Sequence, residues 1–289
     1  VTGKEPLTRP PPVTLYSTAS VREKCVGLVR APLTLLLVAA PLAAEDLFDH
    51  HSLPPTGNEQ AVLVLCPGMN GDGAFFLEES PWREFAGKND LGLMAIHYSS
   101  AVEPMYSEAR QGYYWPEQGS GEALLSEINK VYGEDLPILL YGFLGGAHFV
   151  SRFTEWMPES VVAWSAYSAQ FWDSPTEGEV LPPGIVACGE MDGVRWFPSF
   201  SYFYEGRRLG KLWTWVSLAG TGHVRNGKFE QFVREFFAAV LEGSDSSPVL
   251  VDVLSGEIIE ADEALLQPGL AAILPSVELL EPWQALHAP

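Results

Sequence analysis

The chain has 289 residues, of which 47% are hydrophobic and only 19% are charged, a composition typical of a folded protein with a substantial core. Asp and Glu outnumber Lys and Arg by 37 to 17, which gives a formal charge of −20. A charge of this sign and size repels nucleic-acid phosphates and anionic lipid, so the composition argues against both as partners. We also expect no membrane span, because no uninterrupted apolar stretch reaches the roughly 18–20 residues that a spanning helix needs.

Residues 1–44 have the pattern of an upstream segment followed by an export signal. Basic residues precede an apolar run over residues 31–44, which ends in small residues and is followed by acidic ones. A basic start, a short apolar segment and a small-residue end are typical of a secretory signal peptide. The pattern predicts a secreted or periplasmic protein that is cleaved near Ala44. A buried helix is the alternative, which Pro32 and Pro41 disfavour.

From residue 61 onward, short apolar runs alternate with amphipathic segments. The apolar runs predict buried strands over residues 61–66, 91–97, 137–143, 161–165, 185–188 and 213–218. Helical periodicity predicts helices over residues 81–87, 122–132, 145–157 and 228–241. Strands that alternate with helices indicate an α/β fold, with a doubly wound and mostly parallel sheet.

A polar break separates this pattern from the end of the chain. We therefore expect a main domain over residues 45–242 and a small C-terminal appendage over residues 243–289. The appendage has a β-like piece at residues 249–254 and a helical pattern around residues 278–286.

Three cysteines are too few for a disulfide scaffold. Cys66 and Cys188 each end an apolar run, and the two predicted strands are not neighbours in the expected fold, so both thiols are expected to be free and buried. The spacing of His and Cys predicts no metal site. His50 and His51 are expected in a solvated tail, and Asp72 in a solvated turn. No organic cofactor is expected either.

Residues 137–147, PILLYGFLGGA, carry the most specific signal. A strand runs through Gly-x-x-x-Gly directly into a helix, which is the context of a nucleophile elbow, a sharp turn that exposes one side chain above the sheet. Asp192 follows a later strand and His223 follows the last one, so the nucleophile position, the acid and the base occur in the α/β-hydrolase order. Met69 follows the first strongly apolar predicted strand, residues 61–66, where α/β hydrolases place half of the oxyanion hole.

From about residue 61 to residue 241 the chain resembles α/β hydrolases. It most resembles secreted esterases of the polyhydroxyalkanoate-depolymerase and feruloyl-esterase-like group. The resemblance implies that Asp192 orients the imidazole of His223, which acts as general base. It also implies that the backbone N–H groups of Met69 and Gly145 hold the oxyanion. The substrate or ligand would be an ester, small or polymeric. The family's frequent His-Gly pair is replaced by Pro67-Gly68.

One residue departs from the enzymatic pattern, because the position that should be Ser is Leu144. Leucine has no nucleophilic atom and no proton to transfer to His223, so the chain is predicted to be inactive or strongly impaired. Three explanations remain open. The residue is a point change or sequence error in an active esterase, or the chain is a pseudoenzyme that binds without cleaving, or the site is wrongly assigned. For the last, the candidates are Ser151, Ser165 and Ser168.

Aromatic side chains are expected to line the ligand site. Tyr114 and Trp115 lie in a loop on the carboxyl side of the predicted sheet, where α/β proteins bind ligands, and a lid that packs its own rings is the alternative. Trp172 and Trp196 follow later predicted strands and would extend the same ligand site. Asp173 is the second candidate for the acid, after Asp192.

Overall fold

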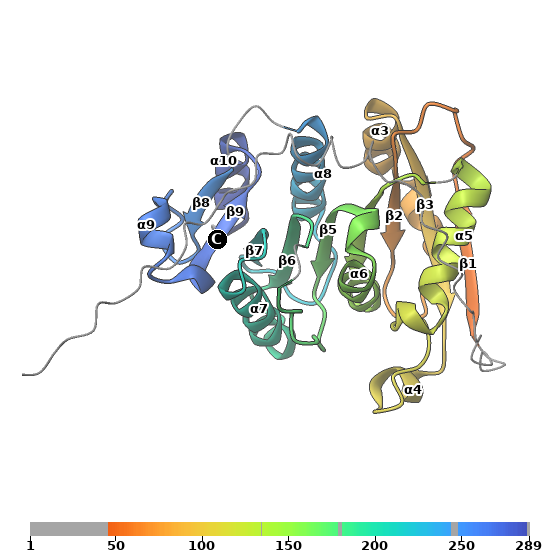
Figure 1. Ribbon diagram of the computed structural model, residues 1–289, viewed down its shortest axis with the longest axis horizontal. Coiled ribbons are helices and arrows are strands. Elements are labelled where there is room, and N and C mark those ends of the chain that lie inside the picture. Colours follow the sequence, from red (N-terminus) through yellow and green to blue (C-terminus); the bar gives the residue numbers. More distant parts are fainter. Residues whose placement is uncertain (1–45, 134, 179–180, 244–247, 288–289) are drawn as a thin grey trace, which may run out of the picture. The chain divides into compact units, whose positions relative to one another are not determined.

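The computed structural model describes residues 46–133, 135–178, 181–243 and 248–287, so the signal peptide expected over residues 1–44 lies outside the described residues. Its main sheet has the strand order β1-β3-β2-β4-β5-β6-β7 (Figure 1). β1 is antiparallel to β3, and the other neighbouring strands are parallel. The predicted α/β fold with a mostly parallel sheet is confirmed.

The predicted elements are present, most with small shifts at their ends. The strands are β1 (Leu47–Ser52), β2 (Ala61–Cys66), β3 (Leu91–Ser99), β4 (Ile138–Phe143), β5 (Val161–Tyr167), β6 (Gly184–Gly189), β7 (Trp213–Leu218), β8 (Val249–Asp252) and β9 (Ala271–Leu274). The helices are α2 (Ala74–Glu78), α3 (Ser80–Lys88), α4 (Val102–Tyr106), α5 (Ser120–Tyr132), α6 (Gly145–Trp156), α7 (Gly193–Arg208), α8 (Gly227–Glu242), α9 (Ala261–Ala264) and α10 (Leu280–His287).

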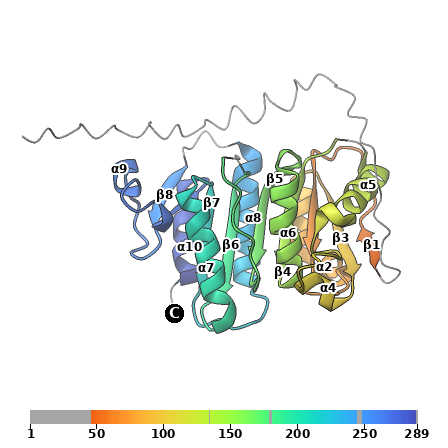
Figure 2. The ribbon, with the colours of Figure 1, turned by 60° about the horizontal axis from the view of Figure 1, so that its bottom comes forward.

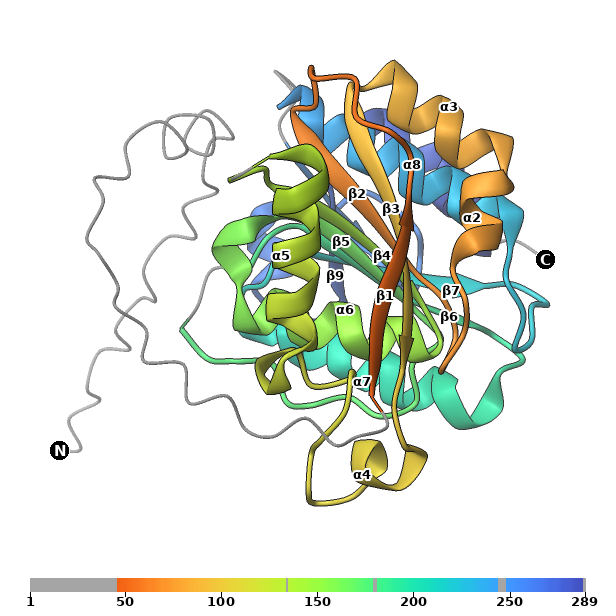
Figure 3. The ribbon, with the colours of Figure 1, turned by 90° about the vertical axis from the view of Figure 1, so that its right-hand side faces the viewer.

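Alternate residues of the central strands enter two cores on opposite faces of the sheet. In β2, Val62 and Val64 belong to the core that contains side chains of α5, α6 and α7, whereas Leu63 and Leu65 belong to the core with α3, α8 and α10. Figure 3 shows α5, α6 and α7 on one side of the sheet and α3 and α8 on the other. Every residue of β2 is buried, which explains why a continuous apolar run marks this strand.

The chain order places a topological switch point between β2 and β4. The chain leaves β2 for β3 on one side, and the next strand, β4, pairs with β2 on its other side. In doubly wound sheets, ligands bind in the crevice at the carboxyl ends of the strands beside such a point. The loop after β2 carries Met69 and the turn after β4 carries Leu144, so both lie at this position.

Several elements are not among those expected from the sequence, and β1 and α7 are the two that matter most for the site. The expectation that His50 and His51 form a solvated tail is wrong, because both lie in β1, an edge strand that pairs with β3. Its half-exposed residues lack the apolar run by which buried strands are predicted. The helix α7 was not predictable from periodicity, since it contains Pro198 and its aromatic residues are not confined to one face.

The segment after residue 248 packs on the β7 edge of the sheet (Figure 2). The indole of Trp283 in α10 donates a hydrogen bond to the backbone oxygen of Trp215 in β7, over 2.7 Å. Cys66 and Cys188, the two cysteines in the described part of the chain, are free and buried as expected. Within the same residues, no helix combines the length and apolar character needed to cross a membrane.

Candidate active site

The turn between β4 and α6 holds Leu144 in a strained conformation. Its φ of 53° and ψ of −110° fall in a region that side-chain-bearing residues rarely adopt, at a cost of about 1–3 kcal/mol. Hydrogen bonds keep it there. The Leu144 N–H donates to the backbone oxygen of Tyr167 over 2.9 Å, and the Ala147 N–H donates to the backbone oxygen of Leu144 over 3.1 Å. The sharp strand-to-helix turn expected from the glycine pattern is therefore present, with Leu144 at its apex.

Beside this turn, His223 and Asp192 form a hydrogen-bonded pair. Nδ1 of His223 donates to Oδ2 of Asp192 over 2.8 Å, and the Asp192 side chain is only 4% exposed. Because the carboxylate accepts this proton, Nε2 of His223 is left as the basic nitrogen. It has no hydrogen-bond partner among the described residues. The His223 ring lies 6.4 Å from that of Phe143, the residue before Leu144, which places the imidazole beside the turn.

Arg195, which sequence analysis did not single out, holds the same carboxylate from a second side. Its guanidinium donates to Oδ1 of Asp192 over 3.2 Å and to Oε1 of Gln170 over 3.3 Å. Arg195 follows Asp192 by three residues at the start of α7, and this helical spacing is the sequence feature from which their contact could have been predicted. Arg195 therefore fixes the carboxylate that orients His223.

Two backbone N–H groups converge in front of the turn. A Cβ atom added at Gly145 would collide with the backbone nitrogen of Met69, so the two peptides lie side by side. Within the described residues, neither N–H group has a hydrogen-bond acceptor. A pair of unpaired N–H groups at a helix N-terminus is suited to hold a negatively charged oxygen.

Tyrosines surround this N–H pair. The same added Cβ would lie 2.7 Å from the hydroxyl of Tyr114, which is within 3.2 Å of the Tyr106 hydroxyl. The Tyr113 hydroxyl accepts a hydrogen bond from the Asn70 N–H over 3.0 Å and so supports the loop that carries Met69. Of the aromatic residues predicted for the ligand site, the structure places Tyr114 beside this N–H pair. Tyr106 was missed because the short helix α4 has no distinctive pattern.

Each of the three tryptophans predicted for the ligand site has a partner within the protein. Trp115 is 6% exposed and lies under the guanidinium of Arg152, 3.8 Å from ring centre to Cζ. Trp172 stacks on Tyr202 at 4.3 Å. The indole of Trp196 donates to the Ser217 hydroxyl over 2.8 Å. Within the described residues, the ring contact of His223 is with Phe143, and none of the three indoles packs on the imidazole.

The alternative site residues have other roles. Asp173 accepts a hydrogen bond from Arg152 over 2.7 Å and does not pair with His223. The Ser151 hydroxyl bonds within its own helix, and that of Ser168 lies 3.9 Å from the Cys188 sulfur. The Ser165 hydroxyl is buried in β5 and has no hydrogen-bond partner in the described part of the chain. Hydrogen bonding therefore links none of the three serines to the imidazole.

His148, in the first turn of α6, is a structural residue behind the site. Its Nδ1 lies 2.8 Å from the backbone oxygen of Phe171, and its Nε2 is 3.4 Å from the Gln170 N–H. Burial, with a contribution from the charge of Arg152, lowers the pKa of His148 to about 3. The imidazole is therefore neutral, with Nδ1 as donor and Nε2 as acceptor.

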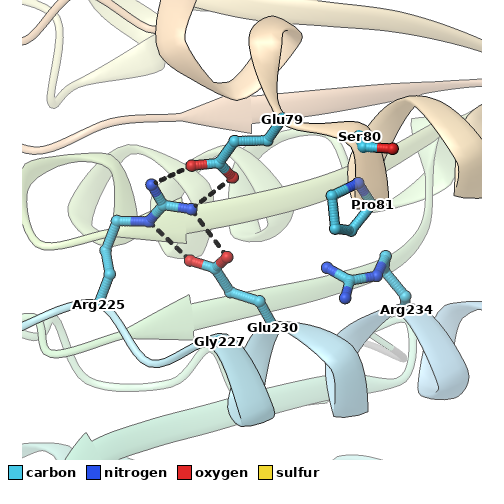
Figure 4. A pocket seen from close by; sticks show the side chains of 7 residues that line it. All are labelled: Glu79, Ser80, Pro81, Arg225, Gly227, Glu230 and Arg234. Carbon is cyan, nitrogen blue, oxygen red and sulfur yellow. Dashed lines mark hydrogen bonds and ion pairs between the residues drawn. The ribbon is translucent and has the colours of Figure 1, made fainter.

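An ionic network anchors the segment that carries His223. Figure 4 shows the guanidinium of Arg225 between the carboxylates of Glu79 and Glu230. Arg225 makes two hydrogen bonds to each, between 2.7 and 2.9 Å. The three side chains line a cavity of about 490 Å³. Because Arg225 is two residues after His223, this network holds the imidazole loop against α3 and α8.

The fold of the chain matches that of known hydrolases. The crystal structure of esterase PE8 has a TM-score of 0.50 and 17% identity, over 67% of this chain and 99% of that one. A candidate α/β hydrolase of unknown function from Agrobacterium tumefaciens has a TM-score of 0.50 and 14% identity, over 68% of this chain and 93% of that one. These likenesses show that the chain has the α/β-hydrolase fold.

A poly(3-hydroxybutyrate) depolymerase from Bordetella parapertussis matches with a TM-score of 0.48 and 16% identity, over 76% of this chain and 88% of that one. That likeness is too low to bear on the substrate. No family model matches the chain, and no curated protein matches it in sequence.

Proposed function

We propose that this chain descends from serine ester hydrolases and keeps their acyl-transfer site without the nucleophile. Asp192 orients His223 as general base, and the N–H groups of Met69 and Gly145 receive the oxyanion of a small or polymeric ester, with no cofactor. The observation that carries the proposal is the strained backbone of Leu144, at the turn between the strand and Gly145. A leucine gains nothing from this strained conformation. The strain is expected if the ancestral residue at position 144 had to project from the turn to react with a substrate.

The proposal implies that ester hydrolysis by this chain is slow. Leucine has no atom to attack the carbonyl, and its side chain occupies space that an attacking water would need. Triad enzymes that lack the nucleophile keep a residual acceleration of roughly 10³–10⁴ over water from the oxyanion hole and binding. We expect the rate acceleration of ester hydrolysis by this chain to be no larger than this residual value.

Restoring the serine tests the proposal. With p-nitrophenyl acetate, Leu144→Ser should raise kcat/KM by at least about 10³-fold over the unmodified chain, because nucleophile loss in a triad costs that much or more. The double variant Leu144→Ser/His223→Ala is the matched control and should return to the unmodified rate. A folded Leu144→Ser variant with no gain, or a gain that survives His223→Ala, would contradict the proposal.

A second candidate function, ligand binding without cleavage, is favoured by an apolar rim beside the N–H pair. Met69, Tyr106 and Phe171 are 44%, 43% and 48% exposed. They also contact one another, since the Tyr106 hydroxyl lies 3.5 Å from the Met69 sulfur and the Tyr106 ring 5.1 Å from that of Phe171. An ester would place its carbonyl on the N–H pair and its acyl chain on this rim.

Binding of methyl octanoate, followed by NMR line broadening of the ligand, tests this second function. Phe171→Asp should abolish the broadening because it places a charge on the apolar rim. Leu266→Asp is the matched control, since Leu266 is 83% exposed in the C-terminal segment. Equal broadening in both variants would exclude the rim as the binding surface.

A further inference from the structure

His51, Asp72 and His97 meet at the edge of the sheet, although they come from three separate segments. His51 lies in β1, His97 in β3 and Asp72 in the loop between β2 and α2. Figure 3 shows β1 beside β3. His51 pairs with Ala95 and Asp49 with His97, so the two histidines lie diagonally on the same face of the antiparallel pair. Their rings stack with centres 6.0 Å apart.

The loop after β2 brings the carboxylate to the two histidines. The Gly73 N–H donates to the backbone oxygen of Ile96 over 3.1 Å. A Cβ at Gly73 would lie 2.6 Å from that oxygen and 2.9 Å from the Cβ of Ala95, so only glycine permits this approach. The Asp72 carboxylate is fixed further by the Ala74 N–H, which donates to Oδ1 over 2.8 Å.

The side chains have the geometry of a ligand set. Nε2 of His51 lies 2.7 Å from Oδ1 of Asp72, and Nδ1 of His97 lies 3.9 Å from Oδ2. One ligand atom from each residue fits within a 4.8 Å span. The His51 Nε2 atom is shielded from solvent, yet it makes no hydrogen bond of acceptable geometry with any described residue. The nitrogen and the carboxylate thus lie within ion-pair distance at the point where an ion would be bound.

We propose that His51, Asp72 and His97 bind a divalent transition-metal ion, with zinc as the ion to be tested. Two imidazole nitrogens and one carboxylate oxygen are ligands that zinc prefers, at about 2.0–2.2 Å. Because ligand atoms on a tetrahedral zinc lie about 3.3 Å apart, side-chain rotation has to close the 4.8 Å span when the ion binds. The side chains of His51, Asp72 and His97 are 38%, 49% and 32% exposed, so water can complete the coordination.

Such an ion would join the β2 loop to the outer strand of the sheet. Asp72 is three residues after Met69, whose N–H belongs to the pair beside Leu144. Coordination would hold this loop through His51 and His97 in addition to the Gly73 hydrogen bond. The ion's ligands lie in β1, β3 and the loop before α2, outside the turn that carries residue 144, so zinc binding can be tested without changing that residue.

Isothermal titration of the full, EDTA-treated chain with zinc chloride tests the proposal. We expect one equivalent to bind. His97→Ala or Asp72→Asn should weaken binding by about 100-fold or more, because losing a ligand costs more than the 10–100-fold typical of losing an outer-shell partner. Asp72→Asn keeps an oxygen to accept from Ala74, so its fold is preserved. His50→Ala is the matched control, because this neighbour in β1 points to the opposite face, where its Nδ1 is 3.9 Å from a Glu127 oxygen.

A second readout separates coordination from adventitious binding. Zinc should raise the thermal midpoint of the unmodified and His50→Ala chains and leave that of Asp72→Asn unchanged. Circular dichroism establishes that each variant is folded. Absence of zinc binding to the unmodified chain would overturn the proposal. It would also be overturned if His50→Ala weakened binding as much as His97→Ala, or if all the variants bound equally.

Discussion

His223 donates a hydrogen bond from Nδ1 to Oδ2 of Asp192 over 2.8 Å, although 31 residues separate them in the chain. The pair forms because Asp192 follows β6 and His223 follows β7, and these strands are parallel neighbours whose carboxyl ends share one edge of the sheet. A buried carboxylate that fixes the imidazole tautomer is the arrangement of an acid–base pair. Its persistence beside Leu144 is the basis of the following predictions.

The acid can be identified in a Leu144→Ser background. Asp192→Asn should lower kcat for p-nitrophenyl acetate by about 10⁴-fold, because His223 then takes the wrong tautomer. Asp173→Asn is the matched control and should change kcat by no more than about twofold, since Asp173 pairs with Arg152. A larger loss for Asp173→Asn would assign the acid to residue 173.

The strain at residue 144 should be measurable as stability. Leu144→Gly removes the whole side chain and Leu144→Ala removes all of it beyond Cβ, but only glycine adopts a φ of 53° without a steric penalty. We expect the glycine variant to have the larger free energy of unfolding, by about 1 kcal/mol after its greater unfolded-state entropy is included. Urea denaturation measures the difference. Equal stability, or a more stable alanine variant, would argue against a strained turn.

The Arg225 network should contribute strongly to stability. Arg225→Met leaves the Glu79 and Glu230 carboxylates without their cationic partner, and Glu230, which is only 5% exposed, keeps the hydrogen bond from the Tyr141 hydroxyl. We expect the free energy of unfolding to fall by about 3 kcal/mol. Arg208→Met is the control, because Arg208 pairs with Glu205 at the surface, where a change within about 0.5 kcal/mol is expected. Similar losses in both variants would mean that the network is no stronger than a surface pair.

His148 should make stability depend on pH. Its pKa is lowered to about 3 in the folded chain, chiefly by burial, against about 6.5 when unfolded. Between these values the unfolded chain binds a proton that the folded chain does not. The His148 contribution is therefore complete above about pH 6.5 and is lost as the pH falls toward 3.

A comparison with His148→Gln isolates this contribution. Glutamine can donate to Phe171 and accept from Gln170 without titrating. The unmodified chain should lose on the order of 2 kcal/mol more than the variant between pH 7 and pH 4.5, as measured by urea denaturation. Parallel pH profiles for the two chains would show that His148 does not titrate on unfolding.

Much of the sheet was predictable because its central strands are buried on both faces. The runs at residues 61–66 and 213–218 give the bounds of β2 and β7 without change, since every position there must be apolar or small. The turn at Leu144 was predictable because its glycines occur at fixed offsets from a strand and a helix. The edge strand β1 was not, because exposure removes the apolar run that marks a buried strand.

The parts of the site that depend on tertiary contacts could not be predicted. Arg195 contacts Asp192 through a local spacing of three residues, but it reaches Gln170 only because the ends of β5 and β6 adjoin. Trp172 and Trp196 follow the expected strands. The Trp172 ring stacks on Tyr202 and the Trp196 indole donates to Ser217, contacts set by side-chain directions that sequence spacing does not specify. No sequence motif marks the set formed by His51, Asp72 and His97. The register of β1 on β3 and the close approach of Gly73 to β3 bring the three residues together.

The central claim is that residue 144 occupies the nucleophile position, and covalent labelling with a fluorophosphonate tests it most directly. Peptide mapping by mass spectrometry should find the label on residue 144 of Leu144→Ser, and no label on the unmodified chain or on Leu144→Ser/His223→Ala. Labelling of the unmodified chain, or of a different serine in the variant, would contradict the claim by placing the reactive residue elsewhere.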